Sequence, residues 1–205
     1  MPWSDFEPKF RPCPNRVDQG LSTLELVISV AIILVISAVA IPTLSYTLRV
    51  YQLNDAANQL AGMVKFTRFQ AIRNNTPVSC VNRSAGANAP ASVWSDDNGD
   101  GVEQPTEKQI ALGSIATLIP QSGAPNTGSL AAAAGVTTMV ALNPASDSIK
   151  FDQRGAVAPP NVYVFYVGNT VNPAGGARAV IVLPSGAVQV WTNPGGAAGM
   201  WQKVS

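Results

Sequence analysis

Apolar positions along this chain follow two different patterns. From Leu26 to Leu48 no side chain is charged, and Ile, Leu, Val and Ala dominate. A helix rises ~1.5 Å per residue, so this run predicts a helix long enough to cross a bilayer. Beyond Arg49 the apolar residues recur at spacings of three and four, which is the period of one helix face. This predicted face comprises Leu53, Ala57, Leu60, Val64, Thr67 and Ala71, widened by Ala56, Met63 and Ile72.

The helix is predicted to begin near Leu21 and to end at about Asn74. Asn75, Thr76 and Pro77 follow, and proline disfavours helical geometry in the residue before it, while asparagine suits caps and turns. Pro42 lies inside the apolar half. Its ring and missing N–H interrupt the hydrogen-bond ladder, so we expect a bend there.

The remainder of the chain predicts β structure, with short runs rich in Val, Ile and Tyr separated by Gly, Pro, Asn and Ser. The candidate strands are 78–83, 92–95, 109–118, 136–142, 148–151, 161–167, 177–183 and 187–192. The Ala/Gly/Pro/Ser-rich segments 84–90 and 121–135 are predicted to be loops. The expected fold class is therefore α+β, with a long N-terminal helix packed through its second half on an antiparallel sheet or sandwich.

Composition argues against catalysis and against binding of polyanions. The sequence has no histidine and a net charge of +1, so the commonest general base and a common metal ligand are missing. Asp147, Asp152 and Arg154 form a polar group outside the loop discussed below, and they resemble turn residues that flank a strand. Cys80 lies in a predicted strand, where a buried and inert thiol is expected. We predict that the protein is not an enzyme.

One acid stands at the start of the apolar helix. Glu25 lies just inside the uncharged run, and Gly20 precedes it. An isolated carboxylate within a membrane segment is costly and usually marks a functional partner. A secretory signal peptide would have a shorter apolar core, with its small-residue cleavage site after that core. The apolar helix is therefore expected to stay in the mature protein.

Gly20, Leu21, Glu25 and Pro42 together resemble the class III signal of type IV prepilins and type II secretion pseudopilins. The resemblance implies cleavage after Gly20 by prepilin peptidase and N-methylation of Leu21, which stands where phenylalanine is usual. It also implies a single-pass protein of the bacterial inner membrane with its C-terminal domain in the periplasm. The implied organisation is a leader (1–20), a transmembrane helix half (21–48), an amphipathic helix half (49–76) and a periplasmic β-rich domain (77–205).

Further segments resemble the H-type pseudopilins and the FimT/FimU minor pilins, known together as the GspH/FimT family. They are 69–74 leading into Pro77, Trp94 before an Asp/Asn/Gly turn, 151–155, and 178–182 before Ser185. The resemblance implies a minor subunit in the tip complex of a type II secretion pseudopilus or type IV pilus, supporting filament initiation and protein secretion. Implied partners are other pilin-like subunits, the inner membrane, prepilin peptidase and secreted exoproteins.

Glu25 would then pair with the free amine of a neighbouring subunit's Leu21. Opposite charges attract strongly in a low dielectric, but desolvation cancels much of the gain, so such a pair fixes register more than it adds stability.

Two alternatives remain open. FimT-like pilins of natural transformation bind DNA through a Gly-Arg-x-Arg run, and here the corresponding stretch 186–189 has neither arginine. Phosphate binding needs clustered Lys or Arg, so DNA is not expected as a partner. The other alternative is a membrane-anchored periplasmic binding module that never polymerises. It predicts indifference to loss of prepilin peptidase and to Glu25→Ala.

The segment 96–107 satisfies the calcium-loop pattern D-x-[DN]-x-[DN]-G-x5-E. Its candidate ligands are Asp96, Asn98, Asp100 and Glu107. However, no helices are predicted on either side, Pro105 falls inside the loop, and Asn-Gly and Asp-Gly pairs favour a hairpin turn. A solvated hairpin tip without a metal is therefore favoured, and calcium stays as the alternative cofactor.

Overall fold

The computed structural model describes residues 22–86, 89–113, 116–169, 176–195 and 200–204. Gly20, Leu21 and the predicted leader lie outside the described residues. The chain divides into two compact units, Met1–Pro42 and Thr43–Ser205, and helix α1 belongs to both.

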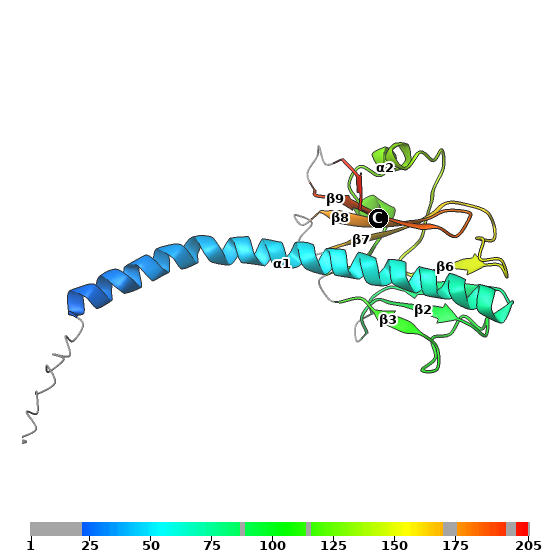
Figure 1. Cartoon of the computed structure of the whole chain (residues 1–205), viewed down its shortest axis with the longest axis horizontal. Helices are drawn as coiled ribbons and strands as arrows, with labels where there is room; N and C mark the ends of the chain where they lie inside the picture. Colours follow the sequence, from blue (N-terminus) through cyan, green and yellow to red (C-terminus); the bar gives the residue numbers. More distant parts are fainter. Residues whose placement is uncertain (1–21, 87–88, 114–115, 170–175, 196–199, 205) are drawn as a thin grey trace, which may run out of the picture. The chain divides into compact units, whose positions relative to one another are not determined.

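Helix α1 spans Thr23–Asn74, 52 residues with Pro42 inside (Figure 1). Its large apolar side chains from Leu24 to Leu48 are exposed. Within the part of the chain that the structure describes, α1 is the one helix long and apolar enough to cross a membrane, with a mean hydropathy of 2.8 in its most apolar window. None of that window is buried in the protein, as expected of a membrane anchor.

The second half of α1 buries the face that its sequence period predicts. Buried positions are Leu53, Ala56, Ala57, Leu60, Ala61, Met63, Val64, Thr67 and Ala71. The prediction is wrong at Ile72, which is 46% exposed. Ile72 lies in the last turn of the helix, beside the turn at Gly155, where the sheets no longer enclose the whole helix face.

Helix α1 ends where the sequence predicts because Asn75 adopts the left-handed conformation (φ 51°). The Asn75 amide donates to the Ile72 carbonyl and the Thr76 amide to the Ala71 carbonyl, both at 3.3 Å. This pair of bonds is a Schellman cap, and asparagine is one of the few residues other than glycine that fit its left-handed position.

The first sheet is antiparallel and has the strand order β3-β2-β1-β6. Its strands are β1 (Val78–Arg83), β2 (Ser92–Asp96), β3 (Gln109–Ala111) and β6 (Ser146–Phe151). The register places Cys80 opposite Ser95 on one side and Ile149 on the other.

The second sheet has the order β10-β9-β8-β7-β4, and β5 pairs in parallel with β7. Its strands are β4 (Thr117–Ile119), β5 (Val140–Ala141), β7 (Tyr163–Gly168), β8 (Ala177–Val182), β9 (Val188–Asn193) and β10 (Gln202–Lys203). Strands β7 and β8 are buried along their whole length, so both faces of this sheet are covered.

Two apolar cores lie on opposite faces of the second sheet. Tyr163, Phe165 and Val167 of β7 pack into the core shared with α1 and the first sheet. Val164 and Tyr166 alternate with them and pack into a second core, which also contains Leu130 of helix α2 (Thr127–Ala134). Figure 1 shows α1 and α2 on either side of β7, β8 and β9.

The structure confirms the α+β class and corrects several predicted elements. Segment 121–135 is not all loop, since it contains the short 3-10 helix η1 (Gln121–Gly123) and α2. Segment 109–118 is broken into β3 and β4, and 136–142 shrinks to β5. Helix α2 forms because a run of alanines carries one fully buried leucine, Leu130, and because Gly135 closes it in the left-handed conformation.

Candidate functional site

The assembly residues predicted from the sequence lie at the N-terminal end of α1. Glu25 sits in the first helical turn, and the Ser29 hydroxyl donates to its main-chain carbonyl at 2.7 Å. Pro42 lies inside the same helix. The cleavage and methylation residues Gly20 and Leu21 lie outside the described residues. Glu25 is thus carried on a helix whose neighbouring apolar side chains are all exposed.

The acidic loop between β2 and β3 brings together three of its four candidate calcium ligands. One carboxylate oxygen from each of Asp96, Asp100 and Glu107 lies within 4.8 Å of the others. Asn98 instead bonds to Asp100, donating from Nδ2 to the carboxylate at 2.9 Å and accepting the Asp100 amide at 3.0 Å. Because β2 pairs antiparallel with β3, the loop also closes the predicted hairpin.

Asp96 is buried beneath this loop and already bonds to it. It is 4% exposed, and its carboxylate accepts the Gly99 amide at 2.7 Å and the Gly101 amide at 3.0 Å. Both glycines have positive φ, the conformation that turns their amides inward at no steric cost. The loop tip is therefore held by its own backbone.

Glu107 closes the other side of the loop. Its carboxylate accepts the Asp97 amide at 3.3 Å and the Gln104 amide at 3.1 Å. Burial raises the pKa of the Glu107 carboxyl above its ordinary value, and the nearby charges of Asp96 and Asp100 add to this, although the two amides oppose it. The hairpin tip is thus less solvated than the sequence suggests, because two of its acids are buried.

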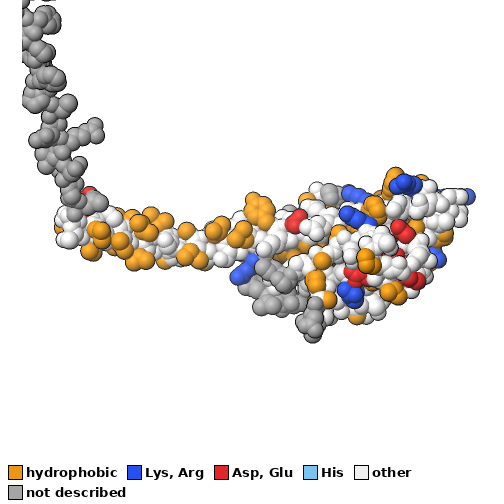
Figure 2. Space-filling view, turned by 90° about the horizontal axis from the view of Figure 1, so that it is seen from below, with side chains coloured by type: hydrophobic (Ala, Val, Ile, Leu, Met, Phe, Trp, Pro, Cys, Tyr) orange, Lys and Arg blue, Asp and Glu red, His pale blue; other side chains and the backbone are white. Residues whose placement is uncertain are grey.

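The same loop folds back over the outer face of β2. Glu103 forms an ion pair with Arg83 at 2.8 Å and accepts the Ser92 hydroxyl at 3.1 Å. Trp94, on the same face of β2 as Ser92, is buried, and its indole Nε1 has no hydrogen-bond partner. Figure 2 shows acidic and basic side chains interspersed over the globular part.

Arg178 was not predicted to be a structural residue, yet it ties α1 to the second sheet. It is the second residue of the otherwise apolar strand β8 and is 3% exposed. Its Nε donates to Asn54 Oδ1 of α1 at 2.6 Å, and its Nη1 donates to the Ala177 carbonyl at 2.9 Å. Burial lowers the pKa of the guanidinium, an effect that Tyr46 partly opposes. An arginine inside an otherwise apolar strand is the sequence signal that could have revealed it.

Cys80 is fully buried, as predicted. Burial raises the pKa of its thiol to about 12, and a hydrogen bond with Thr67 opposes the shift only in part. Thiolates are the reactive form, so this cysteine is a packing residue at neutral pH.

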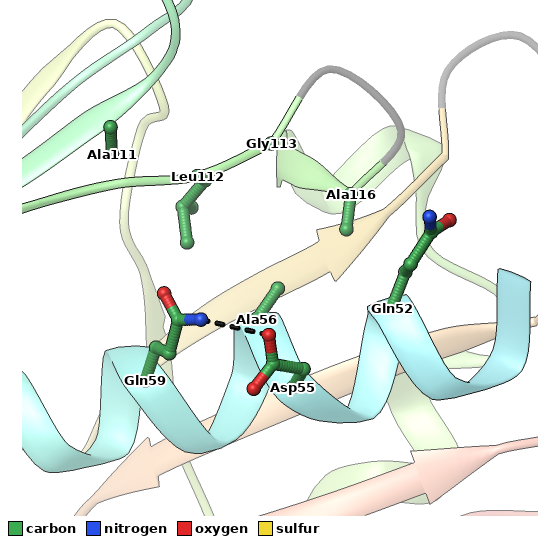
Figure 3. A pocket seen from close by; sticks show the side chains of 8 residues that line it. All are labelled: Gln52, Asp55, Ala56, Gln59, Ala111, Leu112, Gly113 and Ala116. Atoms are coloured by element: carbon green, nitrogen blue, oxygen red, sulfur yellow. Dashed lines mark hydrogen bonds between the residues drawn. The ribbon is translucent and has the colours of Figure 1, made fainter. Parts of the chain in front are cut away.

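A groove of about 320 Å³ lies beside α1 (Figure 3). Its lining residues are Gln52, Asp55, Ala56, Gln59, Ala111, Leu112, Gly113 and Ala116. The Gln59 amide donates to the Asp55 carboxylate at 2.8 Å. Among these lining residues Asp55 is the one titratable side chain, and none of them carries a hydroxyl or thiol group.

The remaining polar group is only partly in turns: Asp152 and Arg154 lie in the turn after β6, whereas Asp147, predicted to flank the strand, lies within β6. Asp152 accepts the amides of Arg154 and Ala156 at 2.9 and 2.8 Å. Asp147 accepts the Asn143 amide at 2.6 Å. Each carboxylate stabilises a local backbone turn.

Comparisons with known proteins found one matching family and two similar solved structures. The family model described as "Type II transport protein GspH" matches residues 56–186. Two crystal structures of the type IV minor pilin FimU of Pseudomonas aeruginosa (strain PAO1) are similar at 14% sequence identity, with TM-scores of 0.47 and 0.46. They cover 68% and 67% of this chain and 88% and 91% of their own. A search of curated proteins found no match.

Proposed function

Because this chain belongs to the GspH family of type II transport proteins, we propose that it is a minor pseudopilin or minor pilin of a filament tip complex. In this role it is a structural subunit of a type II secretion pseudopilus or a type IV pilus and supports filament initiation and secretion of exoproteins. The matched segment 56–186 includes most of the amphipathic half of α1 and most of the β-rich domain.

The observation that carries the proposal is the long helix with two different halves. Its N-terminal half exposes every large apolar side chain, and its C-terminal half is packed on the β domain. Exposed apolar surface of this extent must be covered by lipid or by other apolar helices. A subunit that leaves the inner membrane for a filament uses both environments in turn.

Glu25 gives this transfer its specificity. We propose that prepilin peptidase cuts after Gly20 and that Leu21 becomes the methylated N-terminus. The Leu21 amine of one subunit then pairs with Glu25 of its neighbour. Since a buried ion pair is costly unless its geometry is good, the pair favours one register between adjacent helices. The β domain, in the periplasm before assembly, contacts neighbouring minor subunits.

Processing and assembly can be tested separately. Intact mass and N-terminal sequencing, in cells with and without prepilin peptidase, should show a chain that begins at methylated Leu21 only when the peptidase is present. Glu25→Gln keeps the shape but removes the charge, so we expect normal processing and poor recovery in sheared filaments. Ser29→Ala, one turn along the same helix, is the matched control and should assemble normally.

Two outcomes would contradict the proposal. A chain that retains residues 1–20 in both strains would exclude the pilin pathway and favour the anchored, non-polymerising binding module. Equal incorporation of wild type and Glu25→Gln would exclude the proposed ion pair. We do not favour DNA binding, because Ala187 and Gln189 stand at the two positions where the DNA-binding relatives carry arginine.

We further propose that the acidic loop holds its shape as a hairpin tip without a metal, since Asp96 and Glu107 already accept four amide hydrogen bonds from the loop. Millimolar CaCl2 or EDTA should therefore leave the melting temperature of the full chain unchanged. A rise in melting temperature with calcium that is lost in Asp96→Asn would instead establish the calcium alternative.

A further inference from the structure

We propose that the pocket beneath α2 binds a carboxylate group, an inference that does not rest on the proposed function. The pocket has a volume of about 180 Å³ and lies between the first turns of α2 and the outer face of β7. Its walls include Thr127 and Gly128 of α2 and Tyr166 of β7. The residues that surround it all belong to the described part of the chain.

Tyr166 supplies a hydrogen-bond donor without a partner. The residue is 1% exposed, and its ring packs against Trp201 with centroids 6.2 Å apart. Trp201 is itself fixed, because its indole Nε1 donates to the carbonyls of Pro125 and Asn126. No hydrogen bond to the Tyr166 hydroxyl is found within the described residues, whereas buried hydroxyl groups are normally bonded.

The geometry indicates that this hydroxyl reaches the pocket. Fully enclosed side-chain atoms without a hydrogen-bond partner occur elsewhere, on Gln70, Asn82 and Trp94. The Tyr166 hydroxyl is not one of them, so it is not fully enclosed, and Tyr166 is one of the residues that line the pocket. Burial raises the pKa of Tyr166 to about 12, so the group remains a neutral donor at physiological pH.

The N-terminus of α2 supplies a second, independent attraction for an anion. Asn126 at the N-cap makes no side-chain capping bond. In the described chain, the amides of Thr127 and Gly128 have no hydrogen-bond acceptor. Amides in the first turn of a helix carry the positive end of its dipole and bind anions readily. The uncapped helix end and the unpartnered phenol therefore border the same pocket.

The chemistry of the walls selects a carboxylate on a short apolar stem. No lysine or arginine lines the pocket, so a doubly charged phosphate would lack the cations that usually bind it. Met139 and Val164 provide apolar walls. A volume of about 180 Å³ corresponds to roughly six waters at ~30 Å³ each, which accommodates a propionate-sized group. Such a group is offered either by a small free carboxylic acid or by an acidic side chain of a partner polypeptide.

The test uses the full chain in detergent micelles, with sodium propionate as the probe and saturation-transfer NMR as the readout. Propionamide, its neutral counterpart, should bind at least fivefold more weakly. Tyr166→Phe removes one hydrogen bond to a charged group and should weaken propionate binding by roughly tenfold or more. Tyr163→Phe is the matched control, because Tyr163 lies on the same strand but faces the other core, and it should bind as wild type does.

Two peptides then identify the source of the carboxylate. Binding of acetyl-Ala-Glu-Ala-amide, but not of its Gln counterpart, would identify an acidic side chain of a partner, whereas binding of propionate alone would identify a small acid. The proposal is overturned if propionate shows no saturable binding, if propionamide binds equally well, or if Tyr166→Phe binds propionate as wild type does. Should Tyr166→Phe fail to fold, Thr127→Val replaces it, with a severalfold loss expected.

Discussion

Two turns of the β domain meet at Gly186, and this contact gives the sharpest stability prediction. Gly186 has φ +77°, and a Cβ atom added there would lie 2.1 Å from the Gly155 carbonyl oxygen and 2.7 Å from Arg68 Nε. The same Gly155 carbonyl accepts a hydrogen bond from Arg68 Nε of α1 at 2.9 Å. Gly186→Ala must therefore separate backbone from backbone and disturb the helix contact as well.

The expected cost has three parts. The left-handed conformation costs alanine about 1 kcal/mol. Forcing a methyl group against fixed backbone costs roughly 1–3 kcal/mol, and losing a hydrogen bond from a charged donor costs about 1 kcal/mol more after relaxation. We expect a total destabilisation of about 3–5 kcal/mol, which for a domain of this size lowers the melting temperature by roughly 10 °C.

At Gly62 the same change of glycine to alanine is expected to have the opposite effect on stability. It lies in α1, is exposed, and has nothing within 4 Å of an added Cβ. Alanine loses less conformational entropy than glycine in a helix, so Gly62→Ala should stabilise the protein by about 0.5–1 kcal/mol.

Thermal unfolding of the full chain in detergent, followed by tryptophan fluorescence, measures both variants, because Trp94, Trp191 and Trp201 are all buried. A Gly186→Ala variant that melts within 1 °C of wild type would refute the steric argument. So would a Gly62→Ala variant that is destabilised as much as Gly186→Ala.

Three further predictions follow from buried polar groups. Cys80 should resist iodoacetamide at pH 8 in the native protein and react only after denaturation, since burial raises the pKa of its thiol to about 12; rapid native alkylation would contradict this. Glu107→Gln should melt at a higher temperature than wild type, and this advantage should grow from pH 4 to pH 7. The pKa of Glu107 is raised in the folded protein, so the wild type loses stability as pH rises from the ordinary carboxyl pKa through the folded pKa. A difference in melting temperature between variant and wild type that stays constant across that range would contradict the raised pKa of Glu107. Asn54→Ala should destabilise by about 1–3 kcal/mol by leaving Arg178 Nε without its acceptor, whereas the exposed Asn58→Ala should fall within about 0.5 kcal/mol of wild type in denaturant unfolding.

The sequence predicts best where a single physical rule decides the outcome. The helix period predicts the buried face of α1 from Leu53 to Ala71, and Asn75 before Thr76-Pro77 predicts its end. Burial of Cys80 follows from its position in a predicted strand. Each of these features depends on local spacing or on intrinsic backbone preference. Both can be read from the sequence without knowledge of the tertiary fold.

The features that the sequence analysis predicted wrongly, or did not predict, depend on contacts between distant segments. Helix α2 is too short to be stable alone, and it forms where Leu130 finds a core on the second sheet. Arg178 is buried because Asn54, 124 residues earlier, accepts its hydrogen bond. Asp96 and Glu107 look solvated in an acidic sequence, yet the loop folds back and buries them. Ile72 fits the apolar period, but the sheets leave that part of the helix face open.

The alternation along β7 has an evolutionary consequence. Tyr163, Phe165 and Val167 belong to the core that contains α1, while Val164 and Tyr166 belong to the core beneath α2. The two faces of β7 therefore belong to two separately packed cores. Lineages can accumulate substitutions beneath α2 while the side chains that pack on α1 stay unchanged. The core beneath α2 can thus change in composition while the packing of α1 on the sheet is kept.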